Sequence, residues 1–533
     1  MPRRNSIRAA GALAAALLLG ASGLAGAQGL PEDAGLRGSL DPATERGPIG
    51  RISGNPDNAN PDNGVSDRGW DATVQDEGGS PTTPPPLGGL GDDETLEPPT
   101  PPLGGLGDEA STPAAEEAPS FGISTITGES GLLPPGLEDV SRHRAILPER
   151  HDLDPYVPIG IRVGSFILFP EAEFGTILTD NVLATRFDTQ SDAAMEVAPN
   201  ARLQSDWSRH FFSAEFNGDF SWYRDFPVED DRIYQILLRG RIDVTRRTHF
   251  ELEAEKAQTQ EGRDSASLTD IAGNQVNLHE EHLTAAADHT FNRLTLKLSG
   301  TTAQYRYDDL TDPTLVGDVP FQDIRDYDEN ELALRGTYEF NPDLAWFVDG
   351  AINRRDYKEP VDISGLRRGS DGYVLQTGAQ FRLTGRLTGE LAVGYGEQQS
   401  IDANFDPIQG VLLNGNVIYL PTPTTKIEFL ARSEISETTL VDSLGAVDRF
   451  YELSLQKAFW TYLVLGGYVS YEIADYADNP LVDERVKEGL TAEYYFNPIT
   501  SVYARYERTD FFSTDAANDF IENEVRIGMR LRR

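Results

Sequence analysis

The sequence has no cysteine and few basic residues. The absence of cysteine excludes disulfide bonds, cysteine-ligated zinc, thiol catalysis and a lipid-modified N-terminal cysteine, and it suits an oxidising compartment. Only 46 Lys and Arg residues stand against 86 Asp and Glu residues, which gives the 533-residue chain a formal net charge of −40. Such a charge excludes a general electrostatic attraction to nucleic acid or to anionic lipid head groups, so we expect no nucleic-acid partner.

Long apolar runs are also missing. No stretch approaches the roughly 18 consecutive apolar residues that a membrane helix needs, so any membrane crossing must be made by strands. A shorter apolar run at residues 9–19 follows three arginines and precedes Ala25-Gly26-Ala27, a typical cleavage site. Residues 1–27 are therefore predicted to be a secretory signal peptide. A twin-arginine signal at Arg3-Arg4 is the alternative, but the flanking residues fit it poorly.

Residues 28–120 are rich in Pro, Gly, Asp and Glu and have almost no aromatics. Such a segment cannot bury enough apolar area to offset the entropy of ordering, so we expect a disordered acidic tail. Two short repeats lie within it: residues 55–58 recur at 60–63, and residues 83–94 recur as 100–109. A calcium loop and a docking peptide are the functional interpretations. We favour a low-complexity spacer, because no bidentate Glu follows at loop spacing and no core surrounds either repeat.

Residues 121–160 form an irregular lead-in with a basic patch at Arg142, Arg144 and Arg150. Its prolines block regular structure. Two interpretations stay open. The segment is either a loose connection or a plug that folds into a barrel and pairs with carboxylates there.

Residues 161–533 show a period of two, with no second linker. In residues 250–255, for example, apolar Phe, Leu and Ala alternate with three Glu, and residues 449–478 form a hairpin of the same pattern. Period two predicts strands with one apolar and one polar face, and a water-filled lumen would accept the polar face readily. We count about 18 strands of roughly 12 to 16 residues, longer than the roughly 9 to 11 that cross a membrane. The predicted fold is all-β, a transmembrane antiparallel up-and-down β-barrel after a disordered N-terminal tail.

The connections alternate between short turns and long acidic loops. About eight short turns and about nine long loops are expected for an even-stranded barrel with both termini on the short-turn side. Short turns are periplasmic in bacterial outer-membrane barrels, so the tail should lie in the periplasm. Aromatics beside the short turns, such as Trp207, Trp346 and Trp460, favour an interfacial girdle over ordinary β-propensity.

Enzyme and metal signals are weak. His279 and His282 suggest a metal site, but residues three apart on a strand point to opposite faces. The sequence has no Gly-x-Ser-x-Gly elbow, phosphate-binding Gly-Lys-Ser/Thr loop or HExxH motif. A triad built from distant strands leaves no local spacing and stays open. We therefore predict no enzyme activity, no metal and no cofactor.

A family resemblance begins at Tyr156. The segment Tyr156-x-Pro-x-Gly-Ile-Arg-x-Gly-Ser-Phe166, then Phe169-Pro170, Gly175 and Asp180-Asn-Val182 with Ala184-Thr185, resembles the opening of the putative β-barrel porin type 2 family of outer-membrane proteins, and residues 205–210 resemble its first periplasmic turn. The resemblance extends to the C-terminus and leaves the tail uncovered. It implies architecture, and association with exopolysaccharide or capsule export, without naming a binding residue.

The chain departs from the usual pattern at its end. Outer-membrane strands commonly finish in an aromatic residue that the insertion machinery reads, whereas this chain offers Arg526-x-Gly528-x-x-Leu531 and then Arg533. How the last strand is recognised is therefore open.

The polar faces of the predicted strands carry charges. We interpret them either as a lumen wall whose field selects solutes or as solvated residues that pair across strands. Glu493, Glu522 and Arg530 continue the pattern. The predicted lumen-lining charges are Arg239, Arg241, Asp243, Glu251, Glu253, Glu255, Glu428, Arg432, Glu434, Arg505, Glu507, Glu524 and Arg526.

The leading functional prediction is an outer-membrane channel, as the passage of an exopolysaccharide or surface polymer export system. The alternatives are a general or solute-selective diffusion porin, a structural barrel that anchors a periplasmic docking tail, and an enzyme in the barrel mouth. The expected partners are outer-membrane lipid, the barrel-assembly machinery and, through the tail, periplasmic polysaccharide-export components.

Overall fold

A computed structural model describes residues 153–156, 158–263, 276–308, 322–361, 365–438, 440 and 443–533. The predicted signal peptide, the tail with its repeats and most of the lead-in lie outside the described residues. All described residues belong to one compact unit. No helix within these residues is long and apolar enough to cross a membrane.

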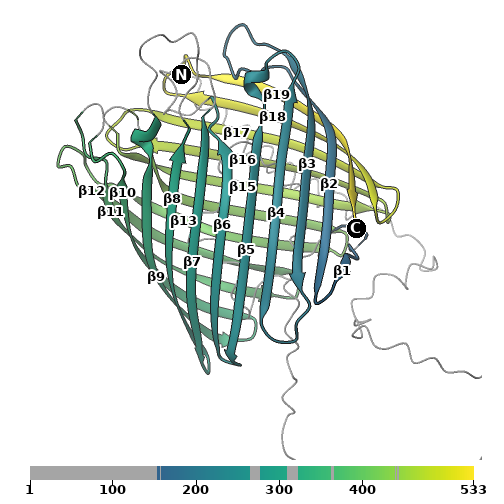
Figure 1. The fold of residues 1–533 in the computed structure, drawn as a ribbon, viewed down its shortest axis with the longest axis horizontal. Helices are drawn as coiled ribbons and strands as arrows, with labels where there is room; N and C mark the ends of the chain where they lie inside the picture. The colour runs from purple at the N-terminus through teal and green to yellow at the C-terminus, as the bar shows by residue number, and fades with distance from the viewer. Residues whose placement is uncertain are drawn as a thin grey trace, which may run out of the picture. The chain divides into compact units, whose positions relative to one another are not determined.

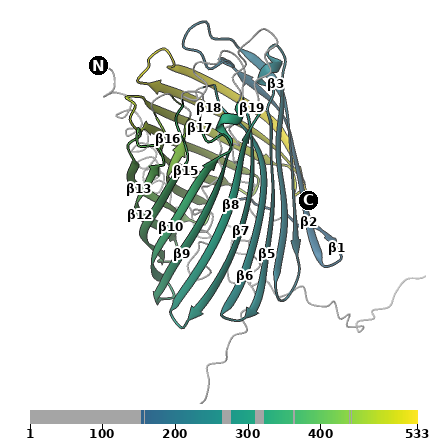
Figure 2. The ribbon, with the colours of Figure 1, turned by 60° about the vertical axis from the view of Figure 1, so that its left-hand side comes forward.

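The described chain forms a closed antiparallel barrel, which confirms the predicted fold class. Each strand pairs with its neighbours in sequence, and the last strand pairs with β2, so 18 strands, β2 to β19, close the wall. Figure 1 shows strands of the near wall crossing in front of those of the far wall, and Figure 2 shows the C-terminus beside β2. A three-residue strand, β1, extends the wall as a small hairpin with β2.

The strands of the wall are 13 to 15 residues long. Two short 3-10 turns, η1 (Pro227–Glu229) and η2 (Gln322–Arg325), lie in connections. The strands are β1 (Ile161–Val163), β2 (Phe166–Thr179), β3 (Asp192–Ser205), β4 (Phe211–Tyr223), β5 (Arg232–Thr245), β6 (Thr248–Gln260), β7 (Asn277–Phe291), β8 (Leu294–Tyr307), β9 (Tyr327–Asn341), β10 (Leu344–Tyr357), β11 (Ser370–Leu383), β12 (Leu387–Ser400), β13 (Ile408–Thr422), β14 (Thr425–Glu437), β15 (Gly445–Phe459), β16 (Leu463–Tyr476), β17 (Val482–Tyr495), β18 (Thr500–Ser513) and β19 (Phe520–Arg532).

The connections separate the barrel into a short-turn end and a long-loop end. The chain enters β2 and leaves β19 at the short-turn end, so both ends of the barrel segment lie there, as predicted. Tight turns such as the one between β9 and β10 join strands at this end, and longer segments such as residues 224–231 join them at the other.

Alternation decides which side chains face outward. On β6, Phe250 and Leu252 are half exposed, whereas Glu253 and Glu255 are buried. The same contrast recurs on β2, where Phe174 and Leu178 are exposed and Glu173 is buried. An apolar outer face and a polar inner face are the reverse of a soluble protein and are typical of a barrel in lipid.

The wall departs from a regular ladder between β13 and β14. The two strands pair from Thr422 and Thr425 to Gly415 and Ala431, and no further. Beyond that point residues 408–414 pair with β12 alone and residues 432–437 with β15 alone. We call this split the β13–β14 joint, and we call the long-loop ends of β14 and β15, residues 432–437 and 445–450, the inner hairpin.

A glycine permits the close strand approach at the joint. A Cβ atom at Gly415 would lie 2.3 Å from the carbonyl oxygen of Glu390 on β12. No side chain fits at that distance from a backbone oxygen, so glycine is required where the wall begins to split.

Candidate functional site

Charged side chains meet across strands that are not neighbours, which identifies the inner face of the barrel. Lys297 on β8 donates to Glu251 on β6 over 2.8 Å. Arg335 on β9 donates to Glu390 on β12 over 2.7 and 2.8 Å, although β10 and β11 lie between these two strands. Side chains from separated strands converge only on the concave side of a curved sheet. The rows of charge therefore lie inside the barrel.

The predicted charges on β5 and β6 form one group of this inner face. Arg239 places Nε 3.0 Å from Glu253 and Nη1 3.4 Å from Glu215 on β4. Arg241 lies 3.1 Å from Asp243 on the same strand. Alternation places these side chains on one face, and the β5–β6 register sets Arg239 directly opposite Glu253.

The remaining carboxylates of β6 bind other partners. Glu251 accepts from Lys297, as described above, and Glu255 accepts a hydrogen bond of 2.6 Å from the amide of Gln235. Each predicted charge of β5 and β6 is thus paired within the wall.

A second group lies where β17, β18 and β19 meet β2 and β3. Arg505 donates to Glu173 over 3.0 Å across the seam, which is the pairing of β19 with β2 that closes the barrel. Arg526 bonds Glu524 on its own strand and Glu196 on β3, the latter at 2.6 Å. These contacts join the last strands to the first and so combine a closure role with a lumen-facing position.

Arg530 is the most enclosed cation of this seam. Its side chain is 3% exposed and lies 2.7 Å from Glu173, 2.7 Å from Glu493 and 3.2 Å from Glu171. One guanidinium therefore holds three carboxylates from β2 and β17. Because its five N–H donors form a planar fork, arginine suits such a shared position better than lysine.

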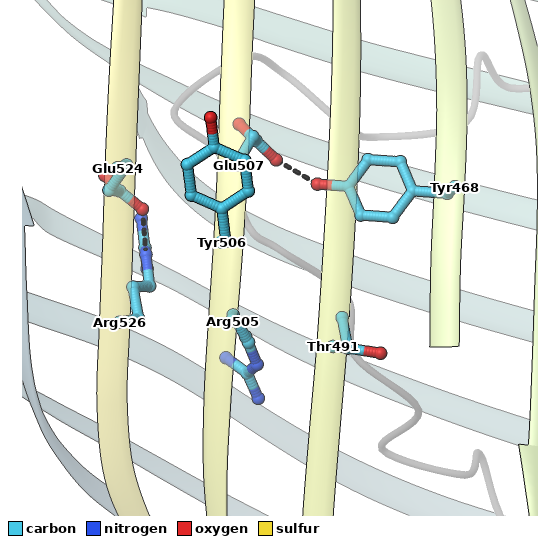
Figure 3. A pocket seen from close by; sticks show the side chains of 7 residues that line it. All are labelled: Tyr468, Thr491, Arg505, Tyr506, Glu507, Glu524 and Arg526. Carbon is cyan, nitrogen blue, oxygen red and sulfur yellow. Dashed lines mark hydrogen bonds and ion pairs between the residues drawn. The ribbon is translucent and has the colours of Figure 1, made fainter. Parts of the chain in front are cut away.

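A small hollow that opens to solvent lies against the strands of the second group. Figure 3 shows Glu524 bonded to Arg526 and Glu507 bonded to the hydroxyl of Tyr468 beside it. Lys487 lies 3.5 Å from Glu507. The residues that line the hollow are Tyr468, Thr491, Arg505, Tyr506, Glu507, Glu524 and Arg526.

The three predicted charges of β14 are less fully paired. Glu428 lies 2.7 Å from Lys426 and accepts a hydrogen bond of 2.8 Å from Asn416. Arg432 stacks over the ring of Phe450, 5.3 Å from its centroid. Glu434 has no ion-pair partner within the described residues. The last two belong to the inner hairpin.

The structure adds inner-face charges that the sequence did not single out. Arg335 and Glu390 pair while buried to 4% and 2% exposure, and Arg355 on β10 pairs with Glu329 on β9 at 3.1 Å. Alternation on β9 could have indicated Glu329 and Arg335. The partner Glu390 lies three strands away, so no local signal connects it to Arg335.

The two histidines considered as metal ligands lie on one continuous strand, β7. His279 approaches Asp308 at 3.1 Å, and His282 approaches Glu280 at 3.5 Å. Within the described residues, no group of three or more His, Asp and Glu side chains has an arrangement that could hold a metal ion.

One carboxylate outside the strands has an altered proton affinity. The backbone N–H groups of Arg367 and Asn404 donate to Asp402, in the connection between β12 and β13, at 3.1 and 3.0 Å. Because these bonds favour the charged form, they hold the pKa of Asp402 below its ordinary value.

Solved structures that match the chain include three proteins of Pseudomonas aeruginosa. OpdL is 12% identical, with 69% of this chain and 99% of that chain covered and a TM-score of 0.38. OpdO is 13% identical, with 69% and 98% covered and a TM-score of 0.38. OccK2 (OpdF), solved in complex with glucuronate, is 11% identical, with 69% and 99% covered and a TM-score of 0.39. A comparison with curated proteins gives no match.

The model of the family described as putative beta-barrel porin 2 matches residues 154–533. The matched region contains every strand of the barrel and both groups of charged residues, and it is the family that the opening motifs resemble. With its apolar outer face and charged inner face, the molecule is a porin-like barrel of the outer membrane. The chain belongs to the putative beta-barrel porin 2 family.

Proposed function

We propose that the barrel is a non-catalytic channel through which small polar solutes diffuse, with a preference for cations. The observation that carries the proposal is the charged inner face of an 18-strand barrel. Barrels of this size enclose an aqueous channel unless they are plugged. Charged rows along such a wall set the field that a passing solute experiences.

The preference for cations follows from the charges that have no ion pair. Glu331, Glu434 and Glu452 have none within the described residues, and the guanidinium of Arg432 offsets Glu434 only in part. Paired charges largely cancel at a distance, so the unpaired carboxylates should dominate the field in the passage.

The segment before the barrel belongs to the same proposal. Asp154 accepts from Arg532 at the end of β19 over 2.7 Å, and the backbone oxygen of Tyr156 accepts from the same guanidinium over 3.0 Å. These bonds hold Asp154 and Tyr156 at the short-turn end of the barrel, where β19 ends. With short turns in the periplasm, as in other outer-membrane barrels, we place the tail there, and the deletion described below decides whether the lead-in is a loose connection or a plug.

Conductance of the full-length protein in a planar bilayer tests the channel. We expect steady channels whose reversal potential in a KCl gradient indicates K⁺ over Cl⁻. A variant that lacks residues 28–152 tests whether the lead-in is a plug. If the variant conducts and the full-length protein does not, the lead-in plugs the lumen. If neither form conducts, the channel proposal fails and a structural anchor takes its place.

Polymer export is the rival within the same architecture, and the family resemblance is its support. No contact among the described residues favours it over diffusion. Deletion of the gene distinguishes the two, because loss of surface polymer with unchanged solute uptake indicates export, whereas slower uptake of small cations indicates diffusion.

A further inference from the structure

The inner hairpin is turned into the barrel at its long-loop end. Arg355 on β10 places Nη1 2.6 Å from Glu437 and Nη2 2.9 Å from the carbonyl oxygen of Ile435 on β14. Three strands separate β10 from β14 along the wall. One arginine side chain spans this separation only if the end of β14 lies against the inner face of β10.

Further bonds fix the hairpin in this position. The hydroxyl of Tyr357 donates to Glu437 over 2.5 Å. Arg368, 5% exposed, donates to the carbonyl oxygens of Thr438 and Ser443 over 2.7 and 3.1 Å. Two buried guanidinium groups and one phenol thus replace the ladder bonds that end at the joint.

The back of the hairpin packs against the wall through the apolar side chains of Ile435 and Val447. A compact apolar cluster fills the space between this back and the inner face of β11 to β13, with contributions from both sides of the joint. Its buried members are Phe405, Ile408, Leu412, Ile435, Leu444 and Val447. This cluster keeps the wall closed where the backbone hydrogen bonds between β13 and β14 are absent. Moving the hairpin away from β11 to β13 would expose the apolar surface of the cluster to water.

The front of the hairpin carries charge. Alternation places Glu434 on the opposite face from Ile435, and Glu434 lies directly across the hairpin from Asp448. Two carboxylates in directly opposed positions repel each other and destabilise the pair. Within the described residues Glu434 has no ion pair, and one oxygen of Asp448 is buried without a hydrogen-bond partner. Ser436 hydrogen-bonds Asp448, and Arg432 on the same face attracts both carboxylates, so two carboxylates stand against one guanidinium on the front of the hairpin.

We propose that the inner hairpin is the constriction and charge filter of the channel, in which Glu434 and Asp448 face the passing solute and favour cations. The inference rests on the proposed channel function and names the element that limits it. A wall segment held inward by Arg355 narrows the passage at the long-loop end, and its front carboxylates face what remains of that passage.

The charge filter is tested by E434Q together with D448N, which keep shape and remove charge. We expect the K⁺ over Cl⁻ permeability ratio to fall by roughly twofold or more, while channels of similar conductance remain. E331Q is the matched control, because Glu331 is an unpaired inner-face carboxylate outside the hairpin. An equal fall in E331Q and in the hairpin variant would overturn the filter and leave the channel intact, whereas a silent wild-type protein would refute the channel itself.

The constriction is tested by releasing and then locking the hairpin. R355Q removes the anchor and should raise single-channel conductance, by roughly twofold if the hairpin swings outward. A Cβ at Gly410 would lie 3.3 and 3.4 Å from the methyl carbons of Val447, within reach of a disulfide across the joint. Because the chain has no cysteine, G410C/V447C introduces a single disulfide with no competing thiol.

The combined variant makes the test decisive. With R355Q and G410C/V447C together, conductance should return to the wild-type value under oxidising conditions and rise again when the disulfide is reduced. A conductance that is unchanged by R355Q and by reduction would show that the hairpin does not limit the passage. If R355Q fails to fold, the isosteric pair E434Q/D448N still tests the filter.

Discussion

The barrel wall is closed in two different ways at two places. At the seam between β19 and β2, the ladder runs without a break from Arg532 and Glu171 to Glu524 and Thr179, and buried ion pairs cover it from inside. At the β13–β14 joint the ladder stops halfway, and an apolar cluster with two arginines closes the rest. A backbone ladder holds neighbouring strands in one continuous wall, whereas side-chain closure lets the wall turn inward.

The largest expected effect is at the seam. Arg530→Met removes the cation shared by Glu171, Glu173 and Glu493 and leaves their charges buried, so the free energy of unfolding should fall by about 3 to 5 kcal/mol. Urea unfolding in phospholipid vesicles, followed by tryptophan fluorescence, measures the loss. Arg224→Met is the control: Arg224 is 81% exposed and 3.9 Å from Asp225, so the change should stay within about 1 kcal/mol. Equal losses in both variants would contradict the seam's role.

A smaller loss is expected where the joint begins. Gly415→Ala puts a Cβ 2.3 Å from the carbonyl oxygen of Glu390, so the backbone must shift, at about 1 to 3 kcal/mol of unfolding free energy. The same unfolding experiment on Gly240→Ala gives the comparison, because the nearest atom there is at an ordinary 3.9 Å. If both alanines cost the same, close approach is not what requires Gly415.

Ser433 replaces part of the missing ladder with its side chain. Its Oγ accepts from the backbone N–H of Leu413 and donates to the carbonyl oxygen of the same residue, both at 3.1 Å. Ser433→Ala should therefore lower the unfolding free energy by about 1 to 2 kcal/mol. Ser213→Ala is a fitting reference, because the hydroxyl of Ser213 is equally buried but has no hydrogen-bond partner within the described residues. A neutral result for both would show that the ladder substitute contributes nothing.

The smallest effect concerns the loops over the joint. Asp402 accepts from the backbone of Arg367, beside Leu366 of the apolar cluster, so Asp402→Ala should speed tryptic cleavage after Arg367 and leave the barrel folded. The lowered pKa of Asp402 gives the same loop a pH dependence. The stabilisation that ionised Asp402 gives this loop is complete above the ordinary aspartate pKa of about 4. It is lost as the pH falls through the lower pKa that Asp402 has in the folded protein. Cleavage rates at neutral pH that match between wild type and variant would contradict this role.

Local alternation predicted much of the site. It identified the charges of β5 and β6, and Arg505, Glu507, Glu524 and Arg526, because each charged residue alternates with an outward apolar one. The functional role of these residues stays a prediction. The same rule did not distinguish the two ends of β14 and β15. One face of each strand was expected to contact lipid, yet Ile435 and Val447 pack against the inner face of β11 to β13.

The sequence by itself determined the fold class, the strand count and which side chains share a face, because a period of two is a property of the extended chain and needs no knowledge of partners. Only the tertiary structure decided that Arg335 meets Glu390, that Arg530 gathers carboxylates from both ends of the barrel chain, and that Arg355 holds the end of β14 inside. Those contacts depend on the curvature of the closed wall and on the register accumulated over several strands, and neither quantity is contained in any local stretch of residues.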